Sequence, residues 1–361
     1  MTEPEILFDL RDGVAEVTLN RPKALNAVTL DMIHRLDERL RAWTEDDAVG
    51  TVVIRGEGRA FAAGGDIRRL YDAGKAGDPY TETFFRDEYR LNRRIFHYPK
   101  PYVAVIGGVT MGGGVGLSVH GSHRIATENT MFAMPETGIG FFPDVGGTYF
   151  LPRLPGRLGI WMALTGARLG GADCLFAGIA THYVPAERLP ALTAALRTLR
   201  LAGNDIEAAQ AAVTAAIEPL SERPSPVPVE ALRSQVDRCF DGGSVEEILE
   251  RLRADGGEWA GKQAAIIEAR SPTAVKVAFE QIRRGAALDL DAALVLEFRI
   301  SQEFMRNPDF FEGVRATILD KDQAPRWQPD RLDAVTDEAV ARYFAPIGGP
   351  GGMRELSFGD G

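Results

Sequence analysis

Hydrophobic and polar residues recur with two different periods along the first half of the chain. Residues 14–19 alternate weakly, as is typical of a strand. Apolar residues at helical spacing fill 30–43, and Thr29 precedes them as a candidate N-cap, which predicts a helix. The same reasoning predicts strands at 51–54, 102–106 and 124–126 and helices at 81–97 and 114–120. Strands separated by helices at this spacing predict an α/β fold with largely parallel strands.

The second half of the chain has a different character, because strand patterns nearly vanish after about residue 155. Helical spacing predicts helices at 186–201 and 206–217 and resumes through Arg315. The segment 219–228 holds four prolines and is expected to be a linker or a rigid connection. We therefore expect three parts: a core over 1–200, a helical region over 201–345 and a flexible tail over 346–361.

Composition and charge narrow the classes of function. The 361 residues carry a net charge of −10, which argues against a general nucleic-acid-binding surface. The two cysteines, Cys174 and Cys239, have no metal-site spacing and are expected to be free thiols in a reducing compartment. The first residues show neither an apolar signal segment nor an Arg-rich amphipathic one, and no long apolar run occurs. We expect a cytoplasmic protein that binds neither nucleic acid nor membrane.

Two carboxylates lie in the segment 135–147, which is too rich in glycine and proline to be a helix. Glu136 and Asp144 are eight residues apart and flank two adjacent phenylalanines, Phe141 and Phe142. Removing an ionised carboxylate from water is costly unless it gains a partner. The two acids are therefore expected near apolar surface, on a loop of defined conformation that suits chemistry on a carbonyl group.

Two glycine-rich loops each follow a predicted strand. One is 111–116, and the other is 62–66, where Asp66 is placed to begin a short helix. Such glycines either let a helix pack closely on a strand or present backbone N–H groups to a developing oxyanion. Neither loop matches a nucleotide motif, since 114–116 lacks the third glycine of the dinucleotide fingerprint and no Gly-Lys-Ser/Thr occurs.

Four further residues carry weaker signals. Ser118 lacks the second glycine of a hydrolase nucleophile elbow, so no nucleophilic role is expected. His120 and His123 could share a helix face but have no third metal ligand nearby, which favours ordinary histidines. Glu88 lies in the predicted helix 81–97, where a solvated charge is the default interpretation.

Several longer motifs recur in a known family. They include LNRP (19–22), AFAAGGD (60–66), RDEYRLN (86–92), MGGGVG (111–116), FAMPET (132–137) and FPDVGG (142–147). Through these motifs the chain resembles the enoyl-CoA hydratase/isomerase (crotonase) superfamily, and within it the 3-hydroxyisobutyryl-CoA hydrolases, over roughly residues 8 to 327. The resemblance implies a spiral of ββα turns and a helical C-terminal region. It also implies an acyl-CoA thioester whose carbonyl lies between the N–H groups of Gly65 and Gly113.

Two positions distinguish hydrolysis from hydration in this resemblance. Hydratases of the superfamily carry a glutamate where Gly116 stands, and they need two glutamates to add water across a double bond. This chain retains only the second, Glu136, and it has Asp144 where the hydratases typically have glycine. The resemblance therefore implies hydrolysis of 3-hydroxyisobutyryl-CoA, as in valine degradation, with 3-hydroxypropionyl-CoA as an open second substrate.

The resemblance also assigns roles to the site residues. Gly65 and Gly113 supply the oxyanion donors, and Glu136 is either a nucleophile that forms a mixed anhydride or a general base on water. Asp144 hydrogen-bonds the substrate's 3-hydroxyl or assists proton transfer, and Glu88 contacts the acyl end or supports Glu136. Coenzyme A is part of the substrate, and no cofactor or metal is expected.

Two other functions stay open on the sequence. An enoyl-CoA hydratase or isomerase acting on a short-chain acyl-CoA is disfavoured by Gly116 and Asp144. A non-catalytic acyl-CoA-binding module would keep the glycine donors and lose the acids, whereas both are present here. Assembly into a homo-oligomer is also left open.

Overall fold

The chain divides into two compact units in the computed structural model, which describes residues 3–199, 201, 205–348 and 353–359. The first unit comprises Met1–Gly65, Arg90–Phe132 and Arg168–Ala231. The second unit comprises Asp66–Tyr89, Ala133–Ala167 and Leu232–Gly361. These units differ from the continuous parts expected at 1–200 and 201–345, because each unit packs together segments that are distant in the sequence.

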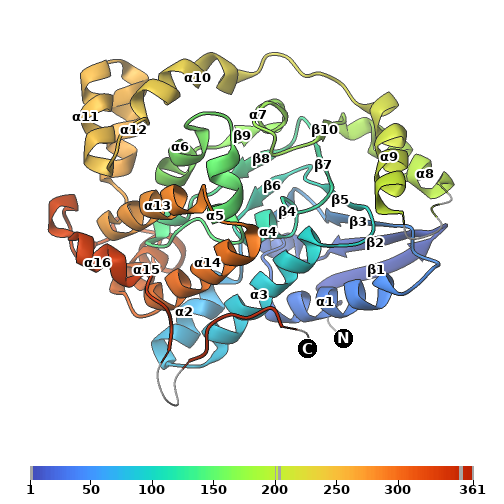
Figure 1. Ribbon diagram of the computed structural model, residues 1–361, viewed down its shortest axis with the longest axis horizontal. Helices are drawn as coiled ribbons and strands as arrows, with labels where there is room; N and C mark the ends of the chain where they lie inside the picture. The colour runs from blue at the N-terminus through green and yellow to red at the C-terminus, as the bar shows by residue number, and fades with distance from the viewer. Residues whose placement is uncertain (1–2, 200, 202–204, 349–352, 360–361) are drawn as a thin grey trace. The chain divides into compact units, whose positions relative to one another are not determined.

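Two β-sheets form the framework of the first unit (Figure 1). The larger sheet has the spatial order β1 (Ile6–Arg11), β2 (Val14–Leu19), β3 (Thr51–Gly56), β5 (Tyr102–Val105), β7 (His123–Ala126) and β10 (His182–Tyr183). The smaller sheet has the order β4 (Ala60–Ala63), β6 (Val109–Met111), β8 (Met131–Ala133) and β9 (Leu169–Gly170). In the larger sheet β1 is antiparallel to β2, and the other neighbours are parallel.

Successive strands alternate between the two sheets. The chain passes from β3 to β4, from β5 to β6 and from β7 to β8, and each time it moves from the larger sheet to the smaller one. Helices α2 (Ile67–Ala76) and α3 (Tyr80–Phe96) follow β4, and the single turn α4 (Gly113–Gly116) follows β6. This order confirms the expected α/β fold with a spiral of ββα turns.

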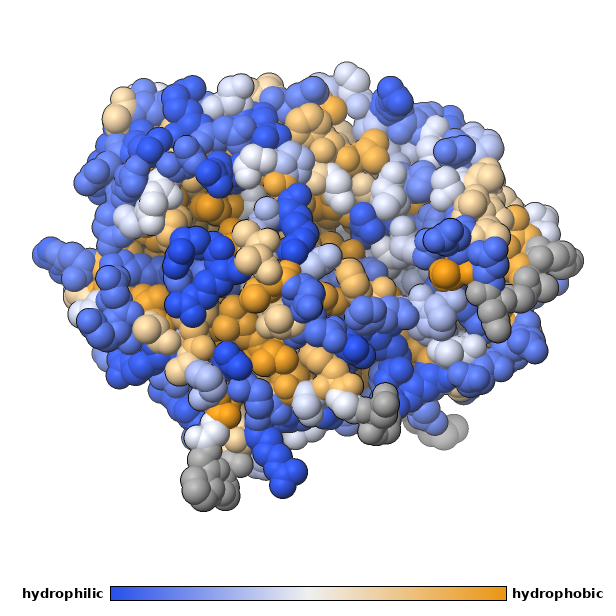
Figure 2. Space-filling view, viewed as in Figure 1, coloured by the Kyte–Doolittle hydropathy of each residue, from blue (hydrophilic) through white to orange (hydrophobic). Residues whose placement is uncertain are grey.

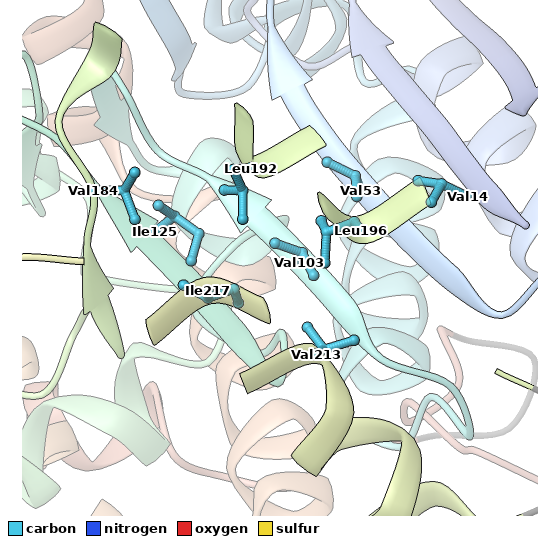
Figure 3. Packing of buried hydrophobic residues seen from close by; sticks show 9 residues of the cluster. All are labelled: Val14, Val53, Val103, Ile125, Val184, Leu192, Leu196, Val213 and Ile217. Carbon is cyan, nitrogen blue, oxygen red and sulfur yellow. The ribbon is translucent and has the colours of Figure 1, made fainter. Parts of the chain in front are cut away.

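Two helices after β10 cover one face of the larger sheet, namely α8 (Leu189–Thr198) and α9 (Ile206–Ile217). Figure 3 shows their apolar side chains directed at those of the strands. The helix side chains in this cluster are Leu192, Leu196, Val213 and Ile217, and the sheet side chains include Val14, Val53, Val103 and Ile125. Fully burying one such side chain is worth about 1.5–3 kcal/mol, so this contact fixes both helices on the sheet.

Local sequence explains the best-predicted helix. In α1 (Leu30–Thr44) the Thr29 side chain accepts a hydrogen bond from the N–H of Met32 over 3.2 Å, as expected of an N-cap. The apolar positions Ile33, Leu36 and Leu40 are all buried. The cap and the apolar face therefore agree on where this helix begins and which side it buries.

Two expectations about secondary structure need correction. The short strands β9 and β10 lie beyond residue 155, where strand patterns nearly vanish in the sequence. They are two residues long and are defined by pairing with β8 and β7, so they carry no periodicity of their own. The helix expected at 114–120 is limited to Gly113–Gly116, because glycine disfavours helix continuation.

The second unit is mainly helical, which confirms the helical character expected of the C-terminal region. The remaining helices are α5 (Gly147–Phe150), α6 (Leu158–Thr165), α7 (Gly171–Phe176), α10 (Pro228–Cys239), α11 (Val245–Asp255), α12 (Glu258–Glu268), α13 (Pro272–Gly285), α14 (Leu290–Phe304), α15 (Pro308–Val314) and α16 (Asp337–Arg342). Within the second unit α13 packs against α5 and α6, and α14 packs against α5. Only α7 in this series belongs entirely to the first unit.

Part of the segment expected to be a tail packs against the second unit. The Arg86 guanidinium donates hydrogen bonds to the backbone oxygens of Arg354 and Glu355. Arg299 of α14 pairs with the Glu355 carboxylate over 3.0 Å, and Leu356 is buried. Residues 349–352 and 360–361 of the expected tail lie outside the described residues.

Charged residues make up 25% of the sequence. On the face drawn in Figure 2, hydrophilic side chains cover much of the surface, and apolar ones gather in groups between them. Within the described ranges, none of the helices combines the length and apolar character needed to cross a membrane.

Candidate active site

Gly65 and Gly113 lie at corresponding positions after two adjacent strands of the first unit. Strands β4 and β6 are parallel, and Ala63 is paired with Met111 at their carboxyl ends. Each glycine comes two residues after this pair, so the chain leaves both strands at the same edge of the sheet. Gly113 is buried and begins α4, so its N–H has no partner within the helix. This geometry suits two donors for one oxyanion, a role that stays a prediction.

Close packing, the other interpretation of these loops, applies to a neighbouring glycine. A Cβ on Gly114 would lie 2.2 Å from the backbone oxygen of Ala62, a distance that no side chain tolerates. Gly64 has a φ of +105°, a conformation that side chains rarely adopt. The loops therefore contain glycines required by packing and backbone conformation beside the two candidate donors.

Three carboxyl groups and a phenol form a buried cluster within the second unit. Glu88 and Tyr89 come from α3, Asp144 from the loop before α5, and Glu297 from α14. The exposed fraction is 3% for Glu88, 6% for Asp144 and 0% for Tyr89 and Glu297. The Tyr89 hydroxyl donates a hydrogen bond to Oδ2 of Asp144 over 2.9 Å. The structure thus brings together two predicted site residues, Glu88 and Asp144, and Glu88 is not on a solvated helix face.

Burial raises the pKa of each acid in this cluster. It raises the pKa of Asp144 to about 7, against the lowering effect of the Tyr89 hydrogen bond. Burial also raises the pKa of Glu297 to about 8, and the N–H group of Gly146 opposes that shift. The pKa of Glu88 lies well above its ordinary value because of burial first, and then because of the Asp144 and Glu297 charges. The cluster therefore holds protons near neutral pH, and its members titrate together.

One oxygen of Glu88 has no hydrogen-bond partner in the part of the chain that the structure describes. Among the described residues, no group bonds to the buried Oε1 atom of Glu88. A buried polar atom without a partner is costly, and such atoms are common where a ligand or a bound water completes the contact. Its raised pKa favours the protonated form of the Glu88 carboxyl, and that form can donate a hydrogen bond.

Glu136 begins the 3-10 turn η2 (Glu136–Ile139) of the second unit and is 7% exposed. The Arg270 guanidinium packs against this turn, because a Cβ on Gly138 would lie 1.9 Å from Nη1 of Arg270. Nη2 of the same guanidinium donates to the backbone oxygen of Thr165 over 2.6 Å. Burial lowers the pKa of Arg270, and the Glu136 charge opposes that shift. Arg270 therefore supplies positive charge that favours an ionised Glu136.

Aromatic rings surround the loop that joins the two acids. The ring of Phe141 lies 5.6 Å from that of Phe85, 5.4 Å from that of Phe304 and 5.6 Å from that of Phe310, between centroids. Gly140 has a φ of +67°, and a Cβ there would lie 2.3 Å from the backbone oxygen of Asp309. The acids therefore lie near apolar surface on a loop of defined conformation, as the sequence predicts.

The residues with weaker signals make structural contacts. The Ser118 hydroxyl donates to the backbone oxygen of Gly114 over 2.8 Å. The His123 ring stacks on that of His182 at 6.0 Å, and its Nε2 lies 3.0 Å from Oγ1 of Thr214. These contacts agree with the structural roles expected of Ser118 and His123.

Sequence reasoning missed three charged or polar residues beside the candidate acids. They are Tyr89, Glu297 and Arg270. The only signal in the sequence is that Glu297 stands between Leu296 and Phe298 in an apolar helical segment. From the sequence alone, a single acid in such a segment looks the same as an acid on the solvent-exposed face of a helix. Gly65 and Gly113 belong to the first unit, and the three predicted acids belong to the second.

Comparison with known proteins gives the class of this chain. A model of the family described as enoyl-CoA hydratase/isomerase matches residues 14–344. A crystal structure of a carnitinyl-CoA dehydratase from Mycobacterium thermoresistibile matches with a TM-score of 0.90 and 42% identity, over 99% of both chains. An enoyl-CoA hydratase structure from Rhodobacter sphaeroides matches with a TM-score of 0.88 and 41% identity, over 98% of this chain and 100% of the other. The chain belongs to the enoyl-CoA hydratase/isomerase family, and its fold is the crotonase fold.

Curated relatives show which members of the family this chain resembles. The chain is 48% identical over 344 residues to the mitochondrial 3-hydroxyisobutyryl-CoA hydrolase of Danio rerio, which covers 95% of this chain and 90% of the relative. It is 45% identical over 345 residues to the protein of the same name from Homo sapiens, over 95% and 89% of the two chains. These identities confirm the similarity to 3-hydroxyisobutyryl-CoA hydrolases that the motifs indicate.

Proposed function

We propose that this chain hydrolyses 3-hydroxyisobutyryl-CoA to 3-hydroxyisobutyrate and coenzyme A, a step of valine degradation. The observation that carries the proposal is 45–48% identity, over more than nine-tenths of the chain, to proteins named for this activity. 3-Hydroxypropionyl-CoA is a second candidate substrate, because it lacks only one methyl group. A pocket distinguishes such a difference by about 1–3 kcal/mol.

The proposed reaction starts with polarisation of the thioester. The N–H groups of Gly65 and Gly113 bind the carbonyl oxygen while Glu136 attacks the carbonyl carbon. The C–S bond breaks, coenzyme A leaves as a thiolate that is then protonated, and the acyl group stays on Glu136 as a mixed anhydride. Water hydrolyses the anhydride and restores the Glu136 carboxylate. In the alternative route Glu136 acts as a general base, and water attacks the carbonyl directly.

The buried cluster supplies recognition in this proposal. Asp144 accepts a hydrogen bond from the substrate's 3-hydroxyl or assists proton transfer, and Glu88 contacts the acyl end or supports Glu136. The raised pKa of Glu88 and its unpartnered oxygen support a role as a hydrogen-bond donor to the ligand. The packing of Arg270 on η2 supports an ionised Glu136, which both routes require.

Thiol release from a panel of acyl-CoAs tests the proposal. We expect release from 3-hydroxyisobutyryl-CoA that survives a chelator. Glu136→Gln keeps the shape of the side chain and removes its charge, so it should lower kcat by about 100- to 10,000-fold while coenzyme A binding persists. The matched control is Glu207→Gln, the same change at an exposed residue of α9. A folded Glu136→Gln variant with most of its activity would exclude both routes.

A covalent intermediate distinguishes the two routes. Rapid-quench mass spectrometry under single-turnover conditions should find the acyl group on the peptide that contains Glu136 if this residue is the nucleophile. Full thiol release with no acylated peptide at any quench time would favour the general-base route. Both outcomes leave the hydrolase proposal in place.

A hydratase activity is the second candidate, since the two similar solved structures are described as a dehydratase and a hydratase. Gly116 argues against it, because hydration in this superfamily needs a second glutamate at that position. Rapid hydration of crotonyl-CoA without thiol release from 3-hydroxyisobutyryl-CoA would replace the hydrolase proposal. Tight binding of acyl-CoA with neither reaction would instead identify a binding module.

Three expectations accompany the proposal. The proposed reaction uses no metal or cofactor, and coenzyme A takes part only as the leaving group. A cytoplasmic location stays an expectation, whereas the curated relatives named above are mitochondrial. Assembly into a homo-oligomer also stays an expectation, and light scattering measures it.

A further inference from the structure

The backbone beside Asp144 adopts an unusual conformation. Val145 has a φ of +53°, in the left-handed region, and Gly146 follows with a φ of +92°. A β-branched residue is strongly disfavoured in this region, because its side chain crowds the backbone. Such a conformation persists only when the surrounding structure holds it.

Glu297 holds the residues that follow Asp144. Its two carboxyl oxygens accept hydrogen bonds from the N–H groups of Gly146 and Thr148, each over 2.8 Å. The side chain is fully buried on α14, which is far from this loop in the sequence. These two bonds join α14 to N–H groups of the chain just after the strained residue.

Gln281 holds the residue that precedes Asp144. Its amide nitrogen on α13 donates to the backbone oxygen of Pro143 over 2.6 Å and to Oγ1 of Thr148 over 2.8 Å. Gln281 is also fully buried. The Asp144 loop is thus bonded on both sides to buried side chains of two C-terminal helices.

The Asp144 carboxylate is then aimed by one further contact. Oδ2 accepts the Tyr89 hydrogen bond over 2.9 Å, which fixes the side chain once the backbone is fixed. Rotation of the strained turn would move the Asp144 backbone relative to Tyr89 and break this alignment. If Asp144 is misplaced, the reaction rate should fall for substrates whose 3-hydroxyl it contacts.

We propose that Glu297 and Gln281 are positioning residues that hold the strained turn at Val145 and so aim Asp144 at the 3-hydroxyl of the substrate. The inference rests on the proposed function in that Asp144 is taken to meet this hydroxyl. It assigns to α13 and α14 a role in selecting 3-hydroxyacyl thioesters over those without the hydroxyl. Simple capping of the short helix α5 is the competing explanation for the Glu297 contacts.

The first test measures selectivity. The readout is the ratio of kcat/KM for 3-hydroxyisobutyryl-CoA to that for isobutyryl-CoA, with thiol release as the assay. Glu297→Gln places an amide donor against one of two N–H groups, so we expect the ratio to fall at least tenfold, mainly through the hydroxylated substrate. Glu303→Gln, the same change on the surface of α14 beside Arg306, should leave the ratio unchanged. An unchanged ratio in folded Glu297→Gln would overturn the proposal.

The second test separates positioning from capping. We call the hydrogen bonds from Glu297 and Gln281 to the Asp144 loop the clamp. In the Glu297→Gln background, Val145→Gly permits the left-handed conformation without the clamp. Val145→Ala removes similar packing but keeps the backbone strain. We expect the glycine variant to recover at least threefold in the ratio and the alanine variant to recover none. Equal ratios in the two double variants would overturn the proposal.

A third variant covers loss of folding. If Glu297→Gln does not fold by circular dichroism, Gln281→Met removes the other half of the clamp at similar volume. It should lower the same ratio severalfold, and an unchanged ratio would overturn the proposal. A wild-type chain that releases no thiol would overturn the proposed function and this inference together, whereas wild-type activity with unaffected variants overturns the clamp alone.

Discussion

Replacing Tyr89 by phenylalanine removes one hydrogen bond from Asp144 and leaves the aromatic ring in place. The lost contact is the 2.9 Å bond from the Tyr89 hydroxyl to Oδ2 of Asp144. This bond stabilises the ionised carboxylate, so it lowers the pKa that burial raises to about 7. Tyr89→Phe should therefore raise the pKa of Asp144 further.

The expected size of the effect follows from the strength of the bond. A hydrogen bond to a charged group contributes about 1.5–3 kcal/mol, which corresponds to about one to two pH units. With a pKa of about 7, roughly half of Asp144 is ionised at pH 7 in the wild type. With a pKa of about 8–9, the ionised fraction at pH 7 falls to roughly 1–10%. If the ionised form binds the 3-hydroxyl, kcat/KM at pH 7 falls about 5- to 50-fold.

Thiol release from 3-hydroxyisobutyryl-CoA between pH 6 and 9.5 measures this effect, after subtraction of spontaneous hydrolysis. The acidic limb of the kcat/KM profile should move upward by about one to two pH units, and activity should recover at high pH. Tyr71→Phe, the same change at a tyrosine of α2 whose ring packs on Phe311, should leave the limb in place. An unshifted limb in folded Tyr89→Phe would refute the argument that ionised Asp144 binds the substrate.

The buried titratable groups also make stability depend on pH in two opposite ways. Folded Asp144 keeps a proton that the unfolded chain loses from about pH 3.8, so wild-type stability falls as pH rises toward about 7. Asp144→Asn should therefore gain about 2–3 kcal/mol in free energy of unfolding, relative to wild type, between pH 5 and pH 8, and urea unfolding that shows no gain contradicts this. Burial first, and then the His182 charge, lower the pKa of His123 from 6.5 to about 4, so stability present above 6.5 is lost as pH falls toward 4. Wild type should lose about 2 kcal/mol from this group between pH 7 and pH 5, and a His123→Asn variant with the same pH dependence as wild type would exclude it.

Helices and strands whose boundaries are set by residues nearby in the sequence could be predicted from the sequence. The Thr29 cap and the apolar spacing of α1 are present in the structure, and Asp66 begins α2 by accepting a hydrogen bond from the N–H of Arg69 over 3.2 Å. Strands β2 and β3 also begin at the residues that the pattern indicates. The interactions that decide these boundaries reach only a few residues along the chain.

The arrangement of the sheets and the composition of the two units could not be predicted in this way. Strands β9 and β10 exist through pairing with β8 and β7, and the alternation of strands between two sheets has no local pattern. The unit boundaries follow packing between distant segments, which is why they differ from the continuous parts expected from composition. Pairing and packing between such segments are properties of the folded chain.

The properties of the candidate site also fall into two groups, those set by local motifs and those set by packing between distant segments. The acids and glycines of the site can be identified from local motifs, because the segments around Gly65, Gly113, Glu136 and Asp144 specify residue types and loop character. The burial of Glu88 beside Asp144 depends instead on packing between distant segments, with side chains supplied by α3 and α14. The pKa of a carboxyl depends on the water it loses and the charges it meets, and both are set here by residues far away in the sequence.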